Sequence, residues 1–96
     1  MKSKVDTCIS IYDATTTIGK MSDKFDSHEF IKKYSELFSP QYKDLVSQYR
    51  MVGSAHALIG SFLSKFSKDL RIESIGRIKS INVNGDKTEC ELWKKC

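Results

Sequence analysis

One stretch of the chain, residues 53–70, constrains the fold more than any other. Its large apolar residues recur with the spacing of an α-helix and form one wide stripe. The stripe consists of Leu58, Ile59, Phe62, Leu63, Phe66 and Leu70. Because such a stripe must be buried, the sequence predicts a core helix that has Ser54 as its N-cap and ends near Leu70.

The opposite face of this predicted helix carries small residues and lysines. Its residues are Ala57, Gly60, Ser61, Ser64, Lys65 and Lys68, and the first acid of the stretch is Asp69. Short side chains let a helix approach another surface closely, and lysines suit a polyanion. This face is what a helix needs to enter a nucleic-acid groove, but small polar residues also occur on ordinary solvated faces.

A second helix is predicted from several local signals that agree. Asp26 is a good N-cap, and Glu29 stands three residues later, as in a capping box. Phe25 and Phe30 occupy the two positions of a hydrophobic staple. We therefore expect a helix from Asp26 to about Phe38.

The single proline separates this helix from the next one. Ser39 and Pro40 read as an N-cap followed by proline at the first helical position. The buried face of the second helix is predicted to contain Tyr42, Leu45, Val46 and Tyr49. This helix should end near Met51, and connections this short force consecutive helices into contact.

Residues 9–21 satisfy two patterns. Isoleucines and threonines favour a strand, whereas four apolar residues recur at helical spacing. These four are Ile11, Ala14, Ile18 and Met21. We favour a short helix that covers one side of the core.

The last part of the chain, residues 71–96, predicts a β-hairpin. Residues 72–77 read as a connector, and residues 78–83 and 87–94 read as two strands around Asn84-Gly85, a strong hairpin signal. Two registers remain open: a two-residue turn pairs Val83 with Asp86, and a four-residue loop pairs Val83 with Thr88. The second register places Ile81 opposite Cys90. Trp93 is expected to fill the space between hairpin and helices.

Size and charge limit the class of protein. The chain has 96 residues and an ordinary apolar fraction of 40%, which predicts one globular domain. No apolar run approaches the roughly 18 residues of a membrane span, and no hydrophobic signal segment follows the N-terminal lysines. We therefore expect a cytoplasmic protein without membrane contact. The net charge of +4 lies wholly in residues 49–96, which hold nine Lys or Arg against five acids.

No pattern for catalysis or metal binding is found in the sequence. Cys8, Cys90 and Cys96 match no zinc or redox spacing, and a disulfide between Cys90 and Cys96 is less probable than free thiols. Cys90 is predicted to be a small buried residue and Cys96 an exposed thiol. His28 and His56 form no recognisable catalytic set with serine, cysteine or carboxylate. We expect no enzymatic activity, no metal and no cofactor.

Three short helices followed by a hairpin, with the third helix apolar on one side and small or basic on the other, resemble the winged helix domain. The resemblance covers about residues 25–95 and includes the stretch 56–63, the Asn84-Gly85 tip and Trp93. It implies an α+β fold with a three-helix core over residues 25–70, a hairpin wing over residues 71–96 and an N-terminal extension over residues 1–24. The strand usually found between the first two helices has no room at Ser39-Pro40 and could only be a short segment near Met51-Val52, so the hairpin is expected rather than a three-stranded sheet.

The resemblance also implies a site, because the third helix of this family lies in the DNA major groove and the wing touches the backbone or the minor groove. The predicted DNA-binding residues are Ser54, His56, Ala57, Ser61, Ser64, Lys65, Lys68, Arg77, Lys79 and Lys87. A bidentate base reader is missing, so mainly phosphate contacts are expected. His56 is more simply read as a half-buried residue with a local hydrogen bond.

The expected partner is double-stranded DNA, with the protein acting in transcription or replication and dimeric if it is sequence-specific. The alternative is a winged helix used for contact with a protein, for instance by a phage or mobile-element factor that acts on a host protein.

Overall fold

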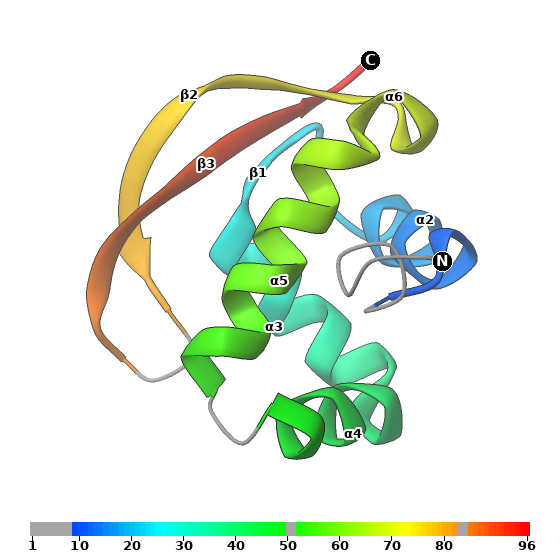
Figure 1. Ribbon diagram of the computed structural model, residues 1–96. Coiled ribbons are helices and arrows are strands. Elements are labelled where there is room, and N and C mark those ends of the chain that lie inside the picture. The colour runs from blue at the N-terminus through cyan, green and yellow to red at the C-terminus, as the bar shows by residue number, and fades with distance from the viewer. Residues whose placement is uncertain (1–8, 50–51, 83–84) are drawn as a thin grey trace.

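The computed structural model describes residues 9–49, 52–82 and 85–96, with the side chains of residues 49 and 52–54 outside the description. The elements in chain order are α2 (Ile11–Gly19), β1 (Lys24–Asp26), α3 (Ser27–Leu37), α4 (Ser39–Tyr49), α5 (Val52–Lys65), α6 (Ser67–Leu70), β2 (Ile72–Ile81) and β3 (Lys87–Lys95). The predicted α+β class is confirmed. In Figure 1 the β2–β3 hairpin arches along one side of α5, and α2 and α4 lie on the other side.

The sheet has three antiparallel strands in the order β1-β3-β2, so β3 is central. Phe25 in β1 pairs with Trp93 in β3, and Ile78 in β2 pairs with Cys90 in β3. The strand β1 was not predicted, because three residues directly before a helix are too few to show an alternating pattern. It lies between α2 and α3 and makes the sheet three-stranded, which was not expected. Only Phe38 separates α3 from α4, the two helices predicted on either side of Ser39-Pro40, so no strand lies between them.

The start of α3 agrees with the sequence prediction. The amide of Glu29 donates to Asp26 Oδ1 at 2.8 Å, and the amide of Asp26 donates to Glu29 Oε1 at 3.0 Å. Both donors would otherwise lack a partner at the helix end. The Phe25 and Phe30 rings are buried with their centroids 6.5 Å apart, which confirms the hydrophobic staple.

Residues 11–19 form a helix, as we favoured. The amide of Asp13 donates to Ser10 Oγ at 3.0 Å, so Ser10 is the N-cap. Ala14 and Ile18 are buried against the core. The helical spacing of the apolar residues therefore outweighed the strand preference of the isoleucines and threonines.

The prediction of one helix over residues 54–70 is wrong at both ends. α5 already begins at Val52, so Ser54 lies inside the helix and is not its N-cap. α5 ends at Lys65, and the separate α6 follows Phe66, whose backbone has φ −104° and ψ 19°. This break turns the chain so that Leu70 is buried and β2 can begin at Ile72.

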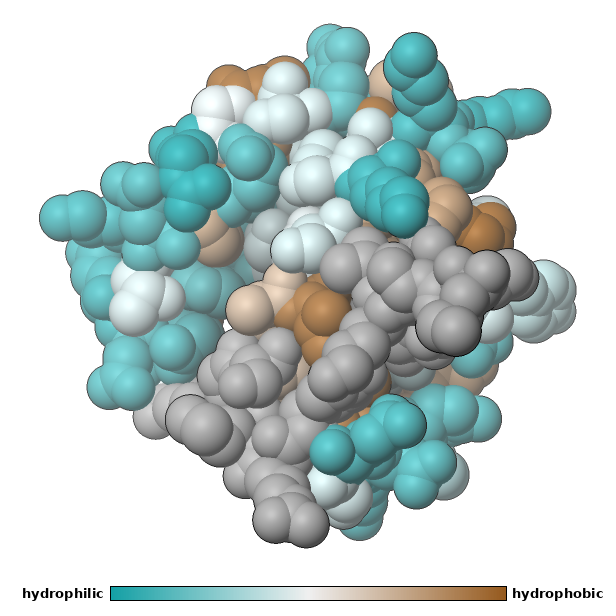
Figure 2. Space-filling model, viewed as in Figure 1, coloured by the Kyte–Doolittle hydropathy of each residue, from teal (hydrophilic) through white to brown (hydrophobic). Residues whose placement is uncertain are grey.

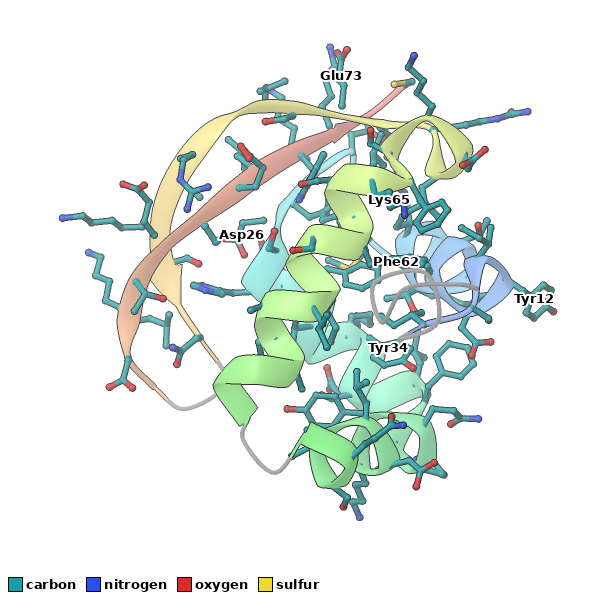
Figure 3. All side chains as sticks on the ribbon, viewed as in Figure 1. Tyr12, Asp26, Tyr34, Phe62, Lys65 and Glu73 are labelled. Carbon is teal, nitrogen blue, oxygen red and sulfur yellow. The ribbon has the colours of Figure 1, made fainter. Side chains whose placement is uncertain are left out.

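The apolar stripe of α5 is buried as predicted. Ile59, Phe62 and Leu63 are fully buried, and Phe66 packs partly buried against the same core. Figure 3 shows Phe62 and Tyr34 inside the molecule, on the side of α5 that faces α2 and α4. The core is therefore built around the helix that the sequence singles out.

The hairpin forms, but with a longer first strand and a different register. β2 takes in residues 72–77, which were predicted to be a connector. Ile81 pairs with Lys87 and Ser80 with Thr88, so both predicted registers are wrong. Ile81 is consequently 60% exposed instead of lying opposite Cys90.

The side chain of Asn82 explains this register. The amide of Asp86 donates to Asn82 Oδ1 at 3.0 Å, and the amide of Asn82 donates to the Asp86 carbonyl at 2.8 Å. Gly85 adopts a left-handed backbone with φ 88°, which glycine accepts at low cost. Asn82 and Asp86 thus close the loop, while Val83 and Asn84 lie outside the described residues.

Trp93 joins the hairpin to the helices, as predicted. It is 2% exposed, belongs to the core and donates from Nε1 to Ser27 Oγ at 3.0 Å. Cys90 is a buried free thiol and Cys96 an exposed one, which also agrees with the prediction. Cys8 lies outside the described residues.

Candidate nucleic-acid interface

A cleft of about 800 Å³ lies between α5 and the hairpin. From α5 it is lined by His56, Ala57, Gly60, Ser61, Ser64 and Lys65, and from the hairpin by Arg77, Asn82, Thr88, Glu89, Cys90 and Glu91. Figure 2 shows a pale, weakly polar band over α5 beside the strongly hydrophilic surface of the hairpin. The helix face that the sequence marks as small therefore borders an open cleft.

The outward side of α5 is accessible along the described part of the helix. Ala57, Ser61 and Ser64 are exposed. A Cβ atom built on Gly60 would have no other atom within 4 Å, so the space above the helix is open. Four predicted site residues, these three and Lys65, are thus brought together on one surface. The side chain of Ser54 lies outside the described residues.

His56 also lines the cleft, but it has a structural partner. Its Nε2 lies 2.7 Å from the Tyr42 hydroxyl, and the two rings are in contact with centroids 5.8 Å apart. Burial lowers the pKa of His56, and the nearby His28 lowers that pKa further. Burial likewise raises the pKa of Tyr42. The hydrogen bond between His56 Nε2 and the Tyr42 hydroxyl links α5 to α4. His56 is therefore a half-buried residue with a local partner, which is the simpler of the two roles expected for it.

The predicted cations do not converge in the cleft. Lys65 and Arg77 line it, whereas Lys68, Lys79 and Lys87 are exposed residues outside its lining. Lys65 Nζ lies 5.8 Å from the centre of the Phe66 ring, near the end of α5. The three other lysines therefore add no charge to the lining of the cleft.

Arg77 is engaged by two carboxylates of the hairpin. Its Nε donates to Glu89 Oε1 at 2.7 Å, and its Nη1 lies 3.8 Å from Glu91 Oε1. The hydrogen bond to Glu89 is the main cause that raises the pKa of Arg77. Glu91 Oε2 also accepts from Ser74 Oγ at 2.7 Å. Among the described residues that line this wall, one cation faces two carboxylates, so the hairpin side of the cleft is left slightly negative.

A second polar cluster lies where β3 meets the start of α3, and sequence reasoning missed it. His28 Nδ1 is 2.7 Å from Ser80 Oγ, and His28 Nε2 is 3.3 Å from Thr88 Oγ1. Ser80 Oγ is in turn 3.6 Å from Cys90 Sγ. Asp26, His28 and Cys90 each offer a ligand atom within 4.8 Å of the others. Cys90 is distant in sequence from Asp26 and His28, so no local motif contains all three residues. Only the neighbouring pair Asp26 and His28 could have suggested a metal site.

Comparisons of the chain with protein-family models, with curated proteins and with solved structures find no match. Among the described helices, none combines the length and the apolar character that crossing a membrane requires. The function must therefore be argued from the fold and the surfaces just described.

Proposed function

We propose that the protein binds duplex DNA, with the outward face of α5 entering a groove and the β2–β3 hairpin lying beside the backbone. The observation that carries the proposal is the accessible face of small side chains on α5, bordered by the hairpin. Ala57, Ser61 and Ser64 present little bulk, and the space over Gly60 is open. A helix must offer such a surface to fit a major groove about 12 Å wide.

The order of elements supports this proposal. A strand between the first two helices, a helix before the hairpin and a small antiparallel sheet are compatible with a winged helix arrangement. α4 is then an additional helix between α3 and α5. Because fold alone does not determine function, the surface of α5 carries more weight than the topology.

Phosphate contacts would come from exposed lysines around the cleft. Lys65 ends α5, Lys68 lies on α6, and Lys79 and Lys87 lie on the hairpin. Lysine binds phosphate as a point charge but reads bases poorly. Since α5 contains no Arg, Asn or Gln, the proposal is binding with little sequence selectivity.

The test is the double variant Lys65→Glu/Lys68→Glu, assayed by fluorescence anisotropy with a labelled duplex at low salt. Both residues are exposed, so duplex binding should be lost while the thermal midpoint stays nearly unchanged. Lys32→Glu/Lys43→Glu is the matched control, because it makes the same charge change at exposed helical positions outside the cleft. Equal loss in both variants, or loss in neither, would contradict the role of α5.

One observation favours a second candidate function, contact with a protein. β2 is an edge strand, and it exposes Ile75 by 42%, Ile78 by 41% and Ile81 by 60%. Exposed apolar side chains on an unpaired strand edge suit strand addition by another chain. A host protein bound by a phage or mobile-element factor would be such a partner. Failure of the parent protein to bind duplex DNA at low salt would favour this second function over DNA binding.

A further inference from the structure

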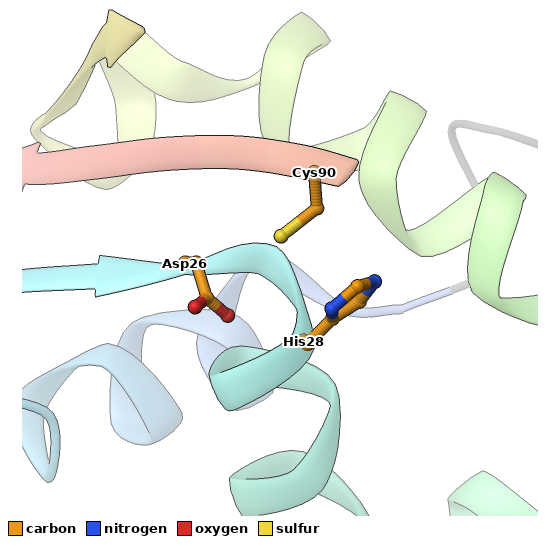
Figure 4. A group of neighbouring side chains, drawn as sticks. All are labelled: Asp26, His28 and Cys90. Carbon is orange, nitrogen blue, oxygen red and sulfur yellow. The ribbon is translucent and has the colours of Figure 1, made fainter. Parts of the chain in front are cut away.

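We propose that Asp26, His28 and Cys90 form a binding site for a zinc-class divalent metal ion. Asp26 ends β1, His28 lies in the first turn of α3, and Cys90 lies in β3. Their ligand atoms lie within 4.8 Å of one another, and Figure 4 shows the three side chains as neighbours that come from three different elements. A carboxylate oxygen, an imidazole nitrogen and a thiolate sulfur are all ligands that zinc accepts.

The carboxylate of Asp26 points independently to a cation. The residue is only 5% exposed, and its Oδ1 accepts one hydrogen bond, from the amide of Glu29. Within the described part of the chain, no lysine, arginine or histidine forms an ion pair with this carboxylate. The Glu29 amide and the N-terminus of α3 compensate this buried carboxylate in part, and a bound divalent ion would compensate it further.

The hydrogen bonds of His28 prepare its Nδ1 for a metal. Nε2 lies 3.3 Å from Thr88 Oγ1, and donation from Nε2–H to this hydroxyl leaves the lone pair on Nδ1. The Ser80 hydroxyl lies 2.7 Å from Nδ1 and 3.6 Å from Cys90 Sγ, so it stands beside both ligand atoms and must move aside or itself bind the ion when a metal enters. Metal-binding histidines are usually oriented in this way, by a partner on the other ring nitrogen.

Binding requires small changes whose protons and charges balance. Two zinc ligands at normal bond lengths are about 3.5 Å apart, so the three side chains must draw together by roughly 1 Å. The Cys90 thiol releases its proton to solvent as the sulfur–metal bond forms. The thiolate and the carboxylate of Asp26 then neutralise the two charges of the ion. Ser80 Oγ, which lies beside both His28 Nδ1 and Cys90 Sγ, is a candidate for the fourth position, and water is the alternative ligand.

Such an ion would join three elements that are distant in sequence. It would tie β3 of the hairpin to β1 and to the start of α3, beside the cleft that His28 and Cys90 help to line. The ion would therefore stabilise the folded chain by mass action and fix the hairpin against the helices. This inference does not depend on DNA binding.

The full chain is first treated with a chelator and kept reduced. It is then titrated with Co²⁺ and afterwards with Zn²⁺. The parent should bind one Co²⁺ with a thiolate charge-transfer band, release about one thiol proton, and lose the band when Zn²⁺ is added. Cys90→Ala should abolish the band. The double variant Cys8→Ala/Cys96→Ala is the matched control and should keep it. No band in the parent, a band retained by Cys90→Ala, or a band lost in the control overturns the proposal.

Thr88→Val provides a second test that does not depend on removing a ligand. Thr88 is exposed, so its substitution should leave the thermal midpoint of the metal-free protein nearly unchanged. Loss of the partner of Nε2 should weaken Co²⁺ binding about 10-fold or more. Unchanged affinity would contradict the orienting role of Thr88 and, with it, ligation through Nδ1.

Discussion

The residues on the two faces of α5 serve different requirements. On the inner face, Ile59, Phe62 and Leu63 are fully buried against the other helices and the sheet. On the outer face, Ala57 and Ser61 are exposed beside the cleft. The inner face is required by the fold whatever the function, whereas the fold places few demands on the outer face. Substitutions on the two faces should therefore separate stability from binding.

The largest expected effect is on the inner face. Phe62→Ala should lower the free energy of unfolding by about 3–5 kcal/mol, since a buried aromatic ring is replaced by a cavity. Small domains have only about 5–15 kcal/mol in total. Urea denaturation would measure the loss, with Ser64→Ala on the outer face as the control, expected within about 0.5 kcal/mol. Similar losses for the two variants would remove the distinction between the faces.

A smaller effect is expected at the edge between the faces, where His56 contacts Tyr42. The folded-state pKa of His56 is lowered, so its contribution to stability is complete above the unfolded value of about 6.5 and is lost as the pH falls through the folded value. The free energy of unfolding should therefore decrease on mild acidification. His56→Gln should reduce this decrease, as measured by urea denaturation at several pH values.

The control for this pH dependence is His28→Gln, which leaves the Tyr42 contact of His56 in place. Its unfolding free energy should still decrease on acidification, though by less than in the parent, because burial remains as a cause of the lowered His56 pKa while the contribution of His28 is lost. If the parent protein's free energy of unfolding does not decrease as the pH is lowered through this range, burial does not destabilise the charged form of His56.

The smallest effect on stability, with a large effect on binding, is expected at Ser61. Ser61→Trp places a bulky ring on the exposed outer face, so the thermal midpoint should change little. The ring would prevent close approach of a duplex to α5, and binding should be lost in the anisotropy assay. Undiminished binding would show that the duplex does not approach this face.

The parts of the fold that could be predicted are those determined by local interactions. Asp26 and Glu29 cap α3 through contacts three residues apart, and Phe25 and Phe30 form the staple five residues apart. The apolar stripe of α5 is likewise visible in its own sequence. These features agree with the structure because each depends on neighbouring residues.

The features that could not be predicted depend on distant residues or on single side chains. The hairpin register follows from Asn82, whose side chain closes the loop, although Asn84-Gly85 is the stronger sequence signal. β1 exists because Phe25 pairs with Trp93. Arg77 was expected to offer a positive charge to DNA, but in the structure it is hydrogen-bonded to Glu89. The cluster of Asp26, His28 and Cys90 forms only once β3 lies beside α3.

The central claim is that α5 and the hairpin bind duplex DNA mainly through phosphate contacts. The most direct measurement is the affinity of the parent protein for a labelled duplex at about 50 mM and about 200 mM salt. The claim predicts measurable binding at the lower salt and a loss of about tenfold or more at the higher salt, because cations are released from the DNA when lysines bind phosphates. No binding at about 50 mM salt, or binding that salt does not weaken, would contradict it.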